Sequence, residues 1–104
     1  WANNETGVIQ SIAELASVAK EKGALFHSDA AQAVGKVPID LTRVPVDLLS
    51  LSGHKVHGPK GIGAIAGSGL TRLSPTVFGG SQEGSIRPGT ENVAFPRRIG
   101  LLKN

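Results

Sequence analysis

The chain has 104 residues and a formal charge of +3, and it contains no cysteine. This length suits one domain or part of one, and the lack of cysteine excludes disulfides, cysteine metal sites and a cysteine nucleophile within the chain. The basic residues are scattered and no segment is apolar enough to cross a membrane, so we expect a cytoplasmic protein with neither a nucleic-acid nor a membrane partner.

The first predicted element is a helix over residues 11–23. Ser11 and Glu14 have the spacing of a capping box, and Gly23 provides the stop. Apolar residues at helical spacing predict one buried face, made of Ile12, Leu15, Ala16 and Ala19. The sequence therefore predicts an amphipathic helix near the start of the chain.

The rest of the chain alternates short apolar runs with connections rich in glycine and proline. Three runs predict buried strands, namely residues 24–28, 46–52 and 63–66. The other segments predict connections: a helical turn over 30–34 closed by Gly35, a proline-containing connection over 36–47, irregular chain or a fourth strand over 72–80, and a polar loop over 81–92. Residues 92–95 have the pattern of a helix start, which Pro96 interrupts.

This order of elements predicts an α/β fold. The strands do not alternate between apolar and polar residues, which is typical of strands covered on both faces. In such sheets ligands lie beyond the carboxyl ends of the strands. Polar clusters over residues 27–32 and 52–55 each follow a predicted strand, so we expect a ligand site at that edge.

Four residues in these clusters have chemistry that fits one cofactor. Asp29 is an N-cap or a carboxylate for a protonated ring nitrogen. Lys55 is a surface or phosphate-binding lysine, or a Schiff-base amine whose pKa is lowered in a partly desolvated pocket. Ser52 and His54 are turn residues or donors to a phosphate. Together, a carboxylate, an amine and phosphate donors are what pyridoxal phosphate requires from a protein.

Other kinds of site fit the sequence less well. His54 and His57 have a spacing that suits a metal on a helix, but glycine and proline surround them and no third ligand is evident, so we predict no metal site. Residues 58–63 lack the pattern of a nucleotide P-loop, and the chain has no Gly-x-Ser-x-Gly elbow for acyl transfer.

Four segments resemble the cysteine desulfurases, which are pyridoxal-phosphate enzymes of the class V aminotransferase type. They are ANNETGVIQ, FHSDAAQAVGK, SLSGHKVHGPKGIGA and GGSQEGSIRPGTEN, in this order over residues 2–92. The resemblance implies part of the large domain of the aspartate-aminotransferase-like fold (fold type I). We therefore expect residues 1–104 to be a partial cofactor-binding domain with an atypical tail over residues 96–104, and a chain that starts at Trp1 and lacks methionine also indicates a fragment.

The resemblance also implies roles for individual residues. Lys55 would be the catalytic lysine, and the cofactor would be bound by Asn4, Asp29, Gln32, Ser52, His54, Lys55 and Thr90. Asp29 would pair with the ring nitrogen, and Gln32 with the 3′-oxygen. Asn4 would lie near that oxygen and the substrate carboxylate. Thr90 would reach the phosphate in the partner subunit of a homodimer.

The implied reaction removes sulfur from L-cysteine, leaving L-alanine and a persulfide on a protein cysteine, and it supplies iron–sulfur cluster assembly through a sulfur-acceptor or scaffold protein. The catalytic cysteine and the arginine that binds the substrate carboxylate lie outside this chain, so we expect the chain alone to be inactive. Two alternatives stay open. One is a selenocysteine lyase or another class V enzyme, and the other is a non-catalytic remnant that serves as a binding module.

Overall fold

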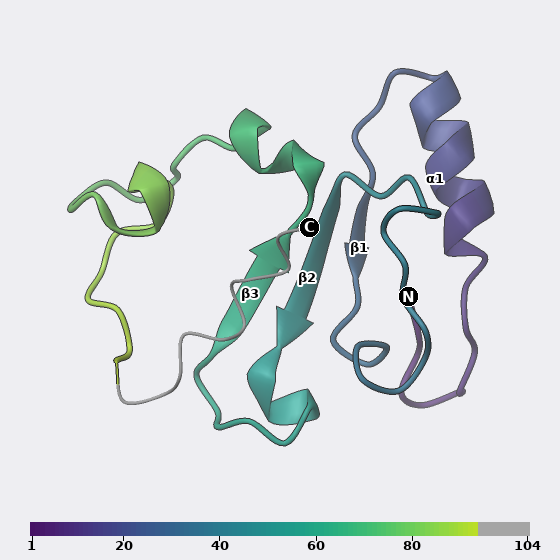
Figure 1. Ribbon diagram of the computed structural model, residues 1–104, viewed down its shortest axis with the longest axis horizontal. Coiled ribbons are helices and arrows are strands. Elements are labelled where there is room, and N and C mark those ends of the chain that lie inside the picture. Colours follow the sequence, from purple (N-terminus) through teal and green to yellow (C-terminus); the bar gives the residue numbers. More distant parts are fainter. Residues whose placement is uncertain (94–104) are drawn as a thin grey trace.

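The computed structural model describes residues 1–93, which form one α-helix beside a three-stranded sheet (Figure 1). The helix is α1 (Ile12–Glu21), and the strands are β1 (His27–Asp29), β2 (Leu48–Ser52) and β3 (Gly63–Ala66). Short 3-10 turns occupy Gly53–Lys55, Ser68–Arg72 and Gln82–Ser85. The predicted α/β class and the positions of the second and third strands are confirmed.

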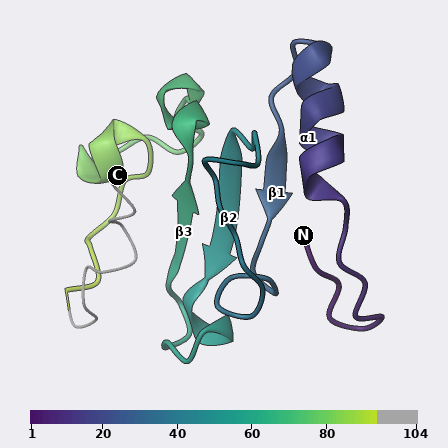
Figure 2. The same cartoon turned by 45° about the vertical axis from the view of Figure 1, so that its right-hand side comes forward.

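The sheet has the order β1-β2-β3 and is mixed. β1 and β2 are parallel, with Asp29 paired to Ser50, whereas β2 and β3 are antiparallel, with Ser52 paired to Gly63. The carboxyl ends of β1 and β2 therefore lie at the same edge of the sheet, which both views show (Figures 1 and 2).

The two faces of the sheet differ in what covers them. Successive side chains of a strand point to opposite faces, so Ser28 and Leu49 share one face while Asp29 and Ser50 share the other. The first face packs on the core, whose buried members are Ile12, Ala16, Ala30, Ala33, Val46 and Leu49. On the second face Ile65 is 51% exposed. Leu48 also lies on this second face and is buried, so both faces are covered at the start of β2 but not at Ile65.

Helix α1 packs on the core through a narrower face than its sequence predicts. Ile12 and Ala16 are buried, but Leu15 is 49% exposed because no described segment lies over that side of the helix. Ser11 is the N-cap residue, yet its side chain makes no capping hydrogen bond, so the predicted capping box does not form. The predicted stop is correct, since Gly23 follows the helix with φ +67°.

Strand β1 begins later than predicted. The amide of Phe26 donates to Asp47 Oδ2 at 2.8 Å, and the carbonyl of Phe26 accepts from the amides of Asp47 and Leu48. A side chain thus takes the place of a strand partner at this position, and regular pairing starts at His27. Leu25 is 41% exposed, so residues 24–26 are not part of a buried strand.

The segment between β1 and β2 contains two turns. The predicted turn after β1 is confirmed: the amide of Val34 donates to the carbonyl of Ala30 at 3.0 Å, and Gly35 ends the turn with φ +75°. The connection over residues 36–47 contains one turn at Asp40. The hydroxyl and amide of Thr42 donate to the Asp40 carboxylate and hold the pKa of that carboxyl below its ordinary value.

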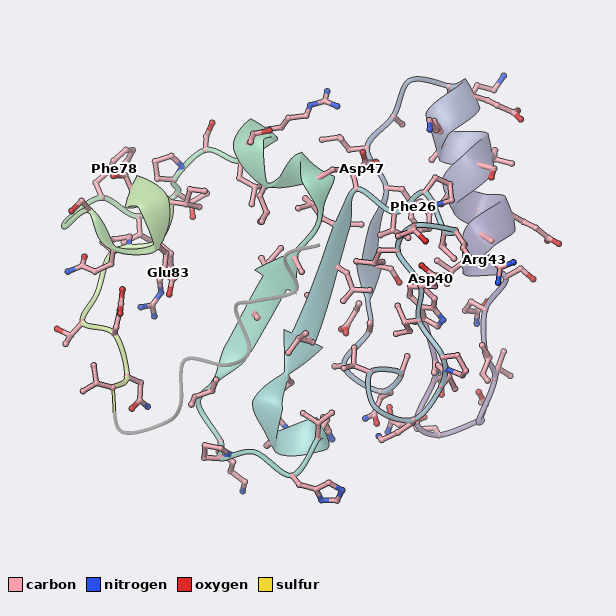
Figure 3. All side chains as sticks on the ribbon, in the orientation of Figure 1. Phe26, Asp40, Arg43, Asp47, Phe78 and Glu83 are labelled. Atoms are coloured by element: carbon pink, nitrogen blue, oxygen red, sulfur yellow. The ribbon has the colours of Figure 1, made fainter. Side chains whose placement is uncertain are left out.

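Residues 73–93 run away from the sheet (Figure 3, where Phe78 and Glu83 mark this segment). Residues 72–80 contain no strand, so the alternative of irregular chain is confirmed. The predicted polar loop over 81–92 is also present, interrupted by the turn Gln82–Ser85. The predicted helix start over 92–95 and the tail over 96–104 extend beyond the described residues. No helix within residues 1–93 is long and apolar enough to span a membrane.

Candidate functional site

Asp29 ends strand β1 and opens the turn that follows it. Its Oδ1 accepts a hydrogen bond from the amide of Ala31 at 2.8 Å, as an N-capping carboxylate does. The next amide, that of Ala30, donates to the carbonyl of Ser50 on β2 at 2.8 Å, and the backbone nitrogen of Trp1 donates to the carbonyl of Asp29 at 2.7 Å. The backbone around Asp29 is thus held at the sheet edge by β2 and by Trp1, the side chain is held by the amide of Ala31, and Oδ2 has no hydrogen bond within residues 1–93.

Lys55 lies in the 3-10 turn that follows β2. Ser52 is the last residue of that strand, and its Oγ lies 2.8 Å from His54 Nδ1. Gly53 is buried, while His54 and Lys55 are exposed. The Lys55 amine has no hydrogen bond or ion pair within residues 1–93, so nothing described here occupies it. The described residues do not enclose it in the partly desolvated pocket that its predicted role requires.

The parallel pairing brings these two clusters to one edge. Asp29 pairs with Ser50, and Ser52 lies two residues further along the same face of β2, about 7 Å from Ser50 by strand geometry. The two turns beyond the strands also meet, because a Cβ added at Gly35 would lie 3.3 Å from Val56 Cγ1. The structure therefore brings together Asp29, Ser52, His54 and Lys55 at the edge that the sequence predicts.

Three other predicted residues lie around this edge in different ways. Gln32 belongs to the turn after Asp29, and its Oε1 accepts from Lys36 Nζ at 2.9 Å, which leaves the amide NH₂ of Gln32 able to donate elsewhere. Asn4 is exposed in the loop that follows Trp1. Thr90 is exposed in the segment 73–93, and no hydrogen bond within residues 1–93 joins it to the turn of Lys55.

One polar pair at this edge is not predicted by the sequence. His27 Nε2 lies 3.1 Å from Ser50 Oγ, and both residues lie on the same face as Asp29. The signal was available in the period of two residues along β1, which places His27 and Asp29 on one side. Within residues 1–93 no group of three or more His, Cys, Asp or Glu side chains could hold a metal.

A cavity of about 360 Å³ lies at the other end of the strands. Its lining includes Ala24, Asp47 and Arg72, which lie before β1, before β2 and after β3. Asp47 marks this end in Figure 3, far along β2 from the Lys55 turn. The cavity is therefore separate from the cluster at the carboxyl edge, and the donor set points to the carboxyl edge as the candidate site.

The donor set at the carboxyl edge fits pyridoxal phosphate. The free oxygen of Asp29 can accept from a protonated ring nitrogen, and the unoccupied amine of Lys55 can react with an aldehyde. Ser52 and His54 share a hydrogen bond, and whichever of the two donates, the pair still offers one further N–H or O–H to a phosphate oxygen. His27 and Asp29 are exposed on the second face of the sheet, which leaves room for a planar ring beside these groups.

Comparisons with known proteins identify the family of the chain. Residues 1–96 match the family described as aminotransferase class-V. The chain is 58% identical over 101 residues to a cysteine desulfurase of Gluconacetobacter diazotrophicus, an alignment that covers 97% of this chain and 25% of that protein. Among solved structures it is similar to SspA in complex with cysteine (TM-score 0.81, 46% identity, 88% of this chain and 27% of that one).

A second solved structure, a NifS-like protein from Rickettsia africae ESF-5, has the same TM-score of 0.81 at 44% identity and covers 88% of this chain and 25% of its own. The chain thus spans about a quarter of the length of the proteins it matches. The predicted fold, part of the large domain of the fold type I transferases, is confirmed by these structures, and the matched residues include Asp29 and Lys55. The chain belongs to the aminotransferase class-V family.

Proposed function

We propose that this chain is the part of a cysteine desulfurase that binds pyridoxal phosphate and carries its catalytic lysine. The observation that carries the proposal is the meeting of Asp29 and the Lys55 turn at the carboxyl edge of β1 and β2. The 58% identity to a protein named cysteine desulfurase, and a similar structure that holds cysteine, favour this enzyme over others of the family.

Each residue of the predicted set has a task that its geometry allows. When bound, the cofactor withdraws electrons from the Cα of an attached amino acid. The Asp29 carboxylate would keep the ring nitrogen protonated, and the free NH₂ of Gln32 would donate to the 3′-oxygen. Ser52 and His54 would hold the phosphate, while Lys55 Nζ would hold the cofactor and move the proton at the substrate Cα.

The remaining parts of the proposal concern the whole protein. Asn4 would approach the substrate carboxylate, and Thr90 would reach the phosphate of a second subunit, which makes the enzyme a homodimer. Residues 1–104 would form part of a large domain in a cytoplasmic enzyme that delivers sulfur to an acceptor or scaffold for iron–sulfur clusters. Because the chain has no cysteine to receive the sulfur, we expect no turnover from these residues alone.

The direct test uses the full-length protein that contains this segment, purified with pyridoxal phosphate. We expect a visible absorption band from the bound cofactor and sulfide release from L-cysteine in the presence of a thiol reductant. Lys55→Ala should abolish both. Lys60→Ala is the matched control, because Lys60 is an exposed lysine in the same loop and has no place in the proposed site.

The outcomes separate the parts of the proposal. A loaded protein that releases selenide from selenocysteine but no sulfide from cysteine would contradict the desulfurase assignment and keep the cofactor site. A visible band that survives Lys55→Ala would contradict the assignment of the lysine itself.

A further inference from the structure

We propose that His57 is a positioning residue: its left-handed backbone closes the loop that carries Lys55 and so sets where the lysine amine lies. The inference rests on the proposed function, because it concerns the amine that would hold the cofactor. His57 has φ +63°, a conformation that residues other than glycine rarely adopt. His57 is not among the residues proposed to bind the cofactor or the substrate.

The closure of the loop depends on the carbonyl of Gly53. This oxygen accepts hydrogen bonds from the amide of Val56 at 3.0 Å and from the amide of Gly58 at 2.8 Å. The second bond spans six residues, as in the Schellman motif, where the residue before the donor lies in the left-handed region. His57 is that residue, and Lys55 lies inside the closed loop.

The C-terminal end of the loop is also hydrogen-bonded to Gly53. The amide of Gly53 donates to the carbonyl of Ile62 at 2.8 Å, so Gly53 joins both ends of the loop to the end of β2. The approach of Gly58 is so close that a Cβ on it would lie 2.8 Å from the Gly53 oxygen. The loop therefore closes in this way only while Gly58 lacks a side chain and His57 keeps its positive φ.

The role belongs to the backbone of His57 and not to its imidazole. The side chain is exposed and makes no hydrogen bond within residues 1–93. Histidine and asparagine enter the left-handed region more readily than other residues, glycine does so freely, and β-branched residues avoid it. Glycine or asparagine should therefore replace His57, whereas valine should open the loop.

The test compares His57→Val with His57→Gly and His57→Asn in the full-length protein. Lys60→Val is the matched control, since it places a β-branched residue in the same loop at a position without a positive φ. Hydrogen exchange of residues 53–62, followed by mass spectrometry without cofactor, should be about tenfold faster in His57→Val and unchanged in the other three.

A second measurement reports how much cofactor is held by the Lys55 amine. With pyridoxal phosphate added, borohydride reduction fixes the cofactor on the amine that holds it, and peptide mapping measures the fixed fraction at Lys55. We expect a severalfold loss in His57→Val together with a shift in the pH at which the visible band changes. His57→Gly and His57→Asn should restore both values, which a loss of the imidazole would not allow.

The inference is overturned if His57→Val exchanges no faster than Lys60→Val, or if His57→Gly behaves like His57→Val. Should His57→Val fail to fold, Gly58→Ala applies the same test, because its Cβ would break the bond to Gly53. Unchanged exchange in Gly58→Ala also overturns it. A wild-type protein that binds no cofactor would end the proposed function, while the exchange rates would still decide the role of His57.

Discussion

Residues 1–72 and residues 73–93 carry motifs of the same family, but they are held in different ways. The first part surrounds a core and fixes Asp29 through strand pairing and Lys55 through the turn that follows β2. The second part contains no buried side chain, and it leaves Phe78 84% exposed. A motif in the first part therefore has its geometry from this chain, whereas Thr90 in the second part depends on surfaces that residues 1–93 do not supply.

The largest expected effect breaks the packing of the first part. Gly67 has φ +134° and ψ 171°, a conformation almost confined to glycine, and a Cβ added there would lie 2.1 Å from the carbonyl oxygen of Asp47. We expect Gly67→Ala to lower the free energy of unfolding by about 3 kcal/mol or more. The measurement is urea unfolding followed by the fluorescence of Trp1, the only tryptophan of the chain.

Gly61→Ala is the control for this prediction. Gly61 also has a positive φ, +85°, but open space surrounds the position of its Cβ. It should therefore cost only the strain of the backbone, about 1 kcal/mol. Equal losses in the two variants would show that the contact with Asp47 does not matter.

The next prediction compares the loss of stability caused by one substitution in residues 1–72 with that caused by one in residues 73–93. Leu49 is 4% exposed and belongs to the core, so Leu49→Ala should cost about 3 kcal/mol through lost burial and a cavity. Phe78 is the larger side chain, but it is exposed, so Phe78→Ala should change the free energy of unfolding by less than about 0.5 kcal/mol. A Phe78→Ala loss as large as that of Leu49→Ala would mean that the second part packs after all.

A smaller effect tests the side chain that delays the start of β1. Asp47→Ala removes the acceptor of the Phe26 amide, and we expect a loss of about 1–2 kcal/mol. Asp47→Asn keeps an oxygen at the same position and should recover most of that loss. The same urea series measures both variants, and similar values for alanine and asparagine would rule out the hydrogen bond as the cause.

The smallest effect concerns pH. The hydrogen bonds from Thr42 lower the pKa of Asp40 in the folded chain below 3.8, so the unfolded chain binds its proton first as the pH falls. The stabilisation is complete well above pH 3.8 and is lost as the pH falls through the lowered pKa. Asp40→Asn should therefore show a shallower loss of stability in acid than the wild type, measured by urea unfolding across this range. Parallel curves would contradict the prediction.

The sequence predicts this molecule best where the signal is local. The helix, its stop at Gly23 and the turn closed by Gly35 need only neighbouring residues, and all are confirmed. One local prediction, the capping box of Ser11 and Glu14, is wrong. The other differences depend on distant segments: Asp47 binds the amide of Phe26 and shortens β1, and no described segment covers Leu15.

The site was also predictable only in part. The proximity of Asp29 and Lys55 was predictable because parallel strands end at one edge, and the pairing of β1 and β2 confirms the premise. The left-handed backbone of His57 was not predictable, since histidine gives no such signal by itself and the conformation arises from the closure on Gly53. The roles proposed for the site residues stay predictions, namely those of Asn4, Asp29, Gln32, Ser52, His54, Lys55 and Thr90.

The reversal of direction between β2 and β3 also bears on the order in which the chain folds. Ser52 pairs with Gly63 across a short loop, whereas Asp29 pairs with Ser50 across a longer one, so the β2–β3 hairpin has the lower entropic cost of closure. We expect the β2–β3 hairpin to form first, so that the Lys55 turn would be in place before β1 pairs with β2. Substitutions in β3 should then slow refolding, while substitutions in β1 should mainly speed unfolding. The turn that carries Lys55 would thus form before the pairing of β1 with β2 brings Asp29 to the same edge of the sheet.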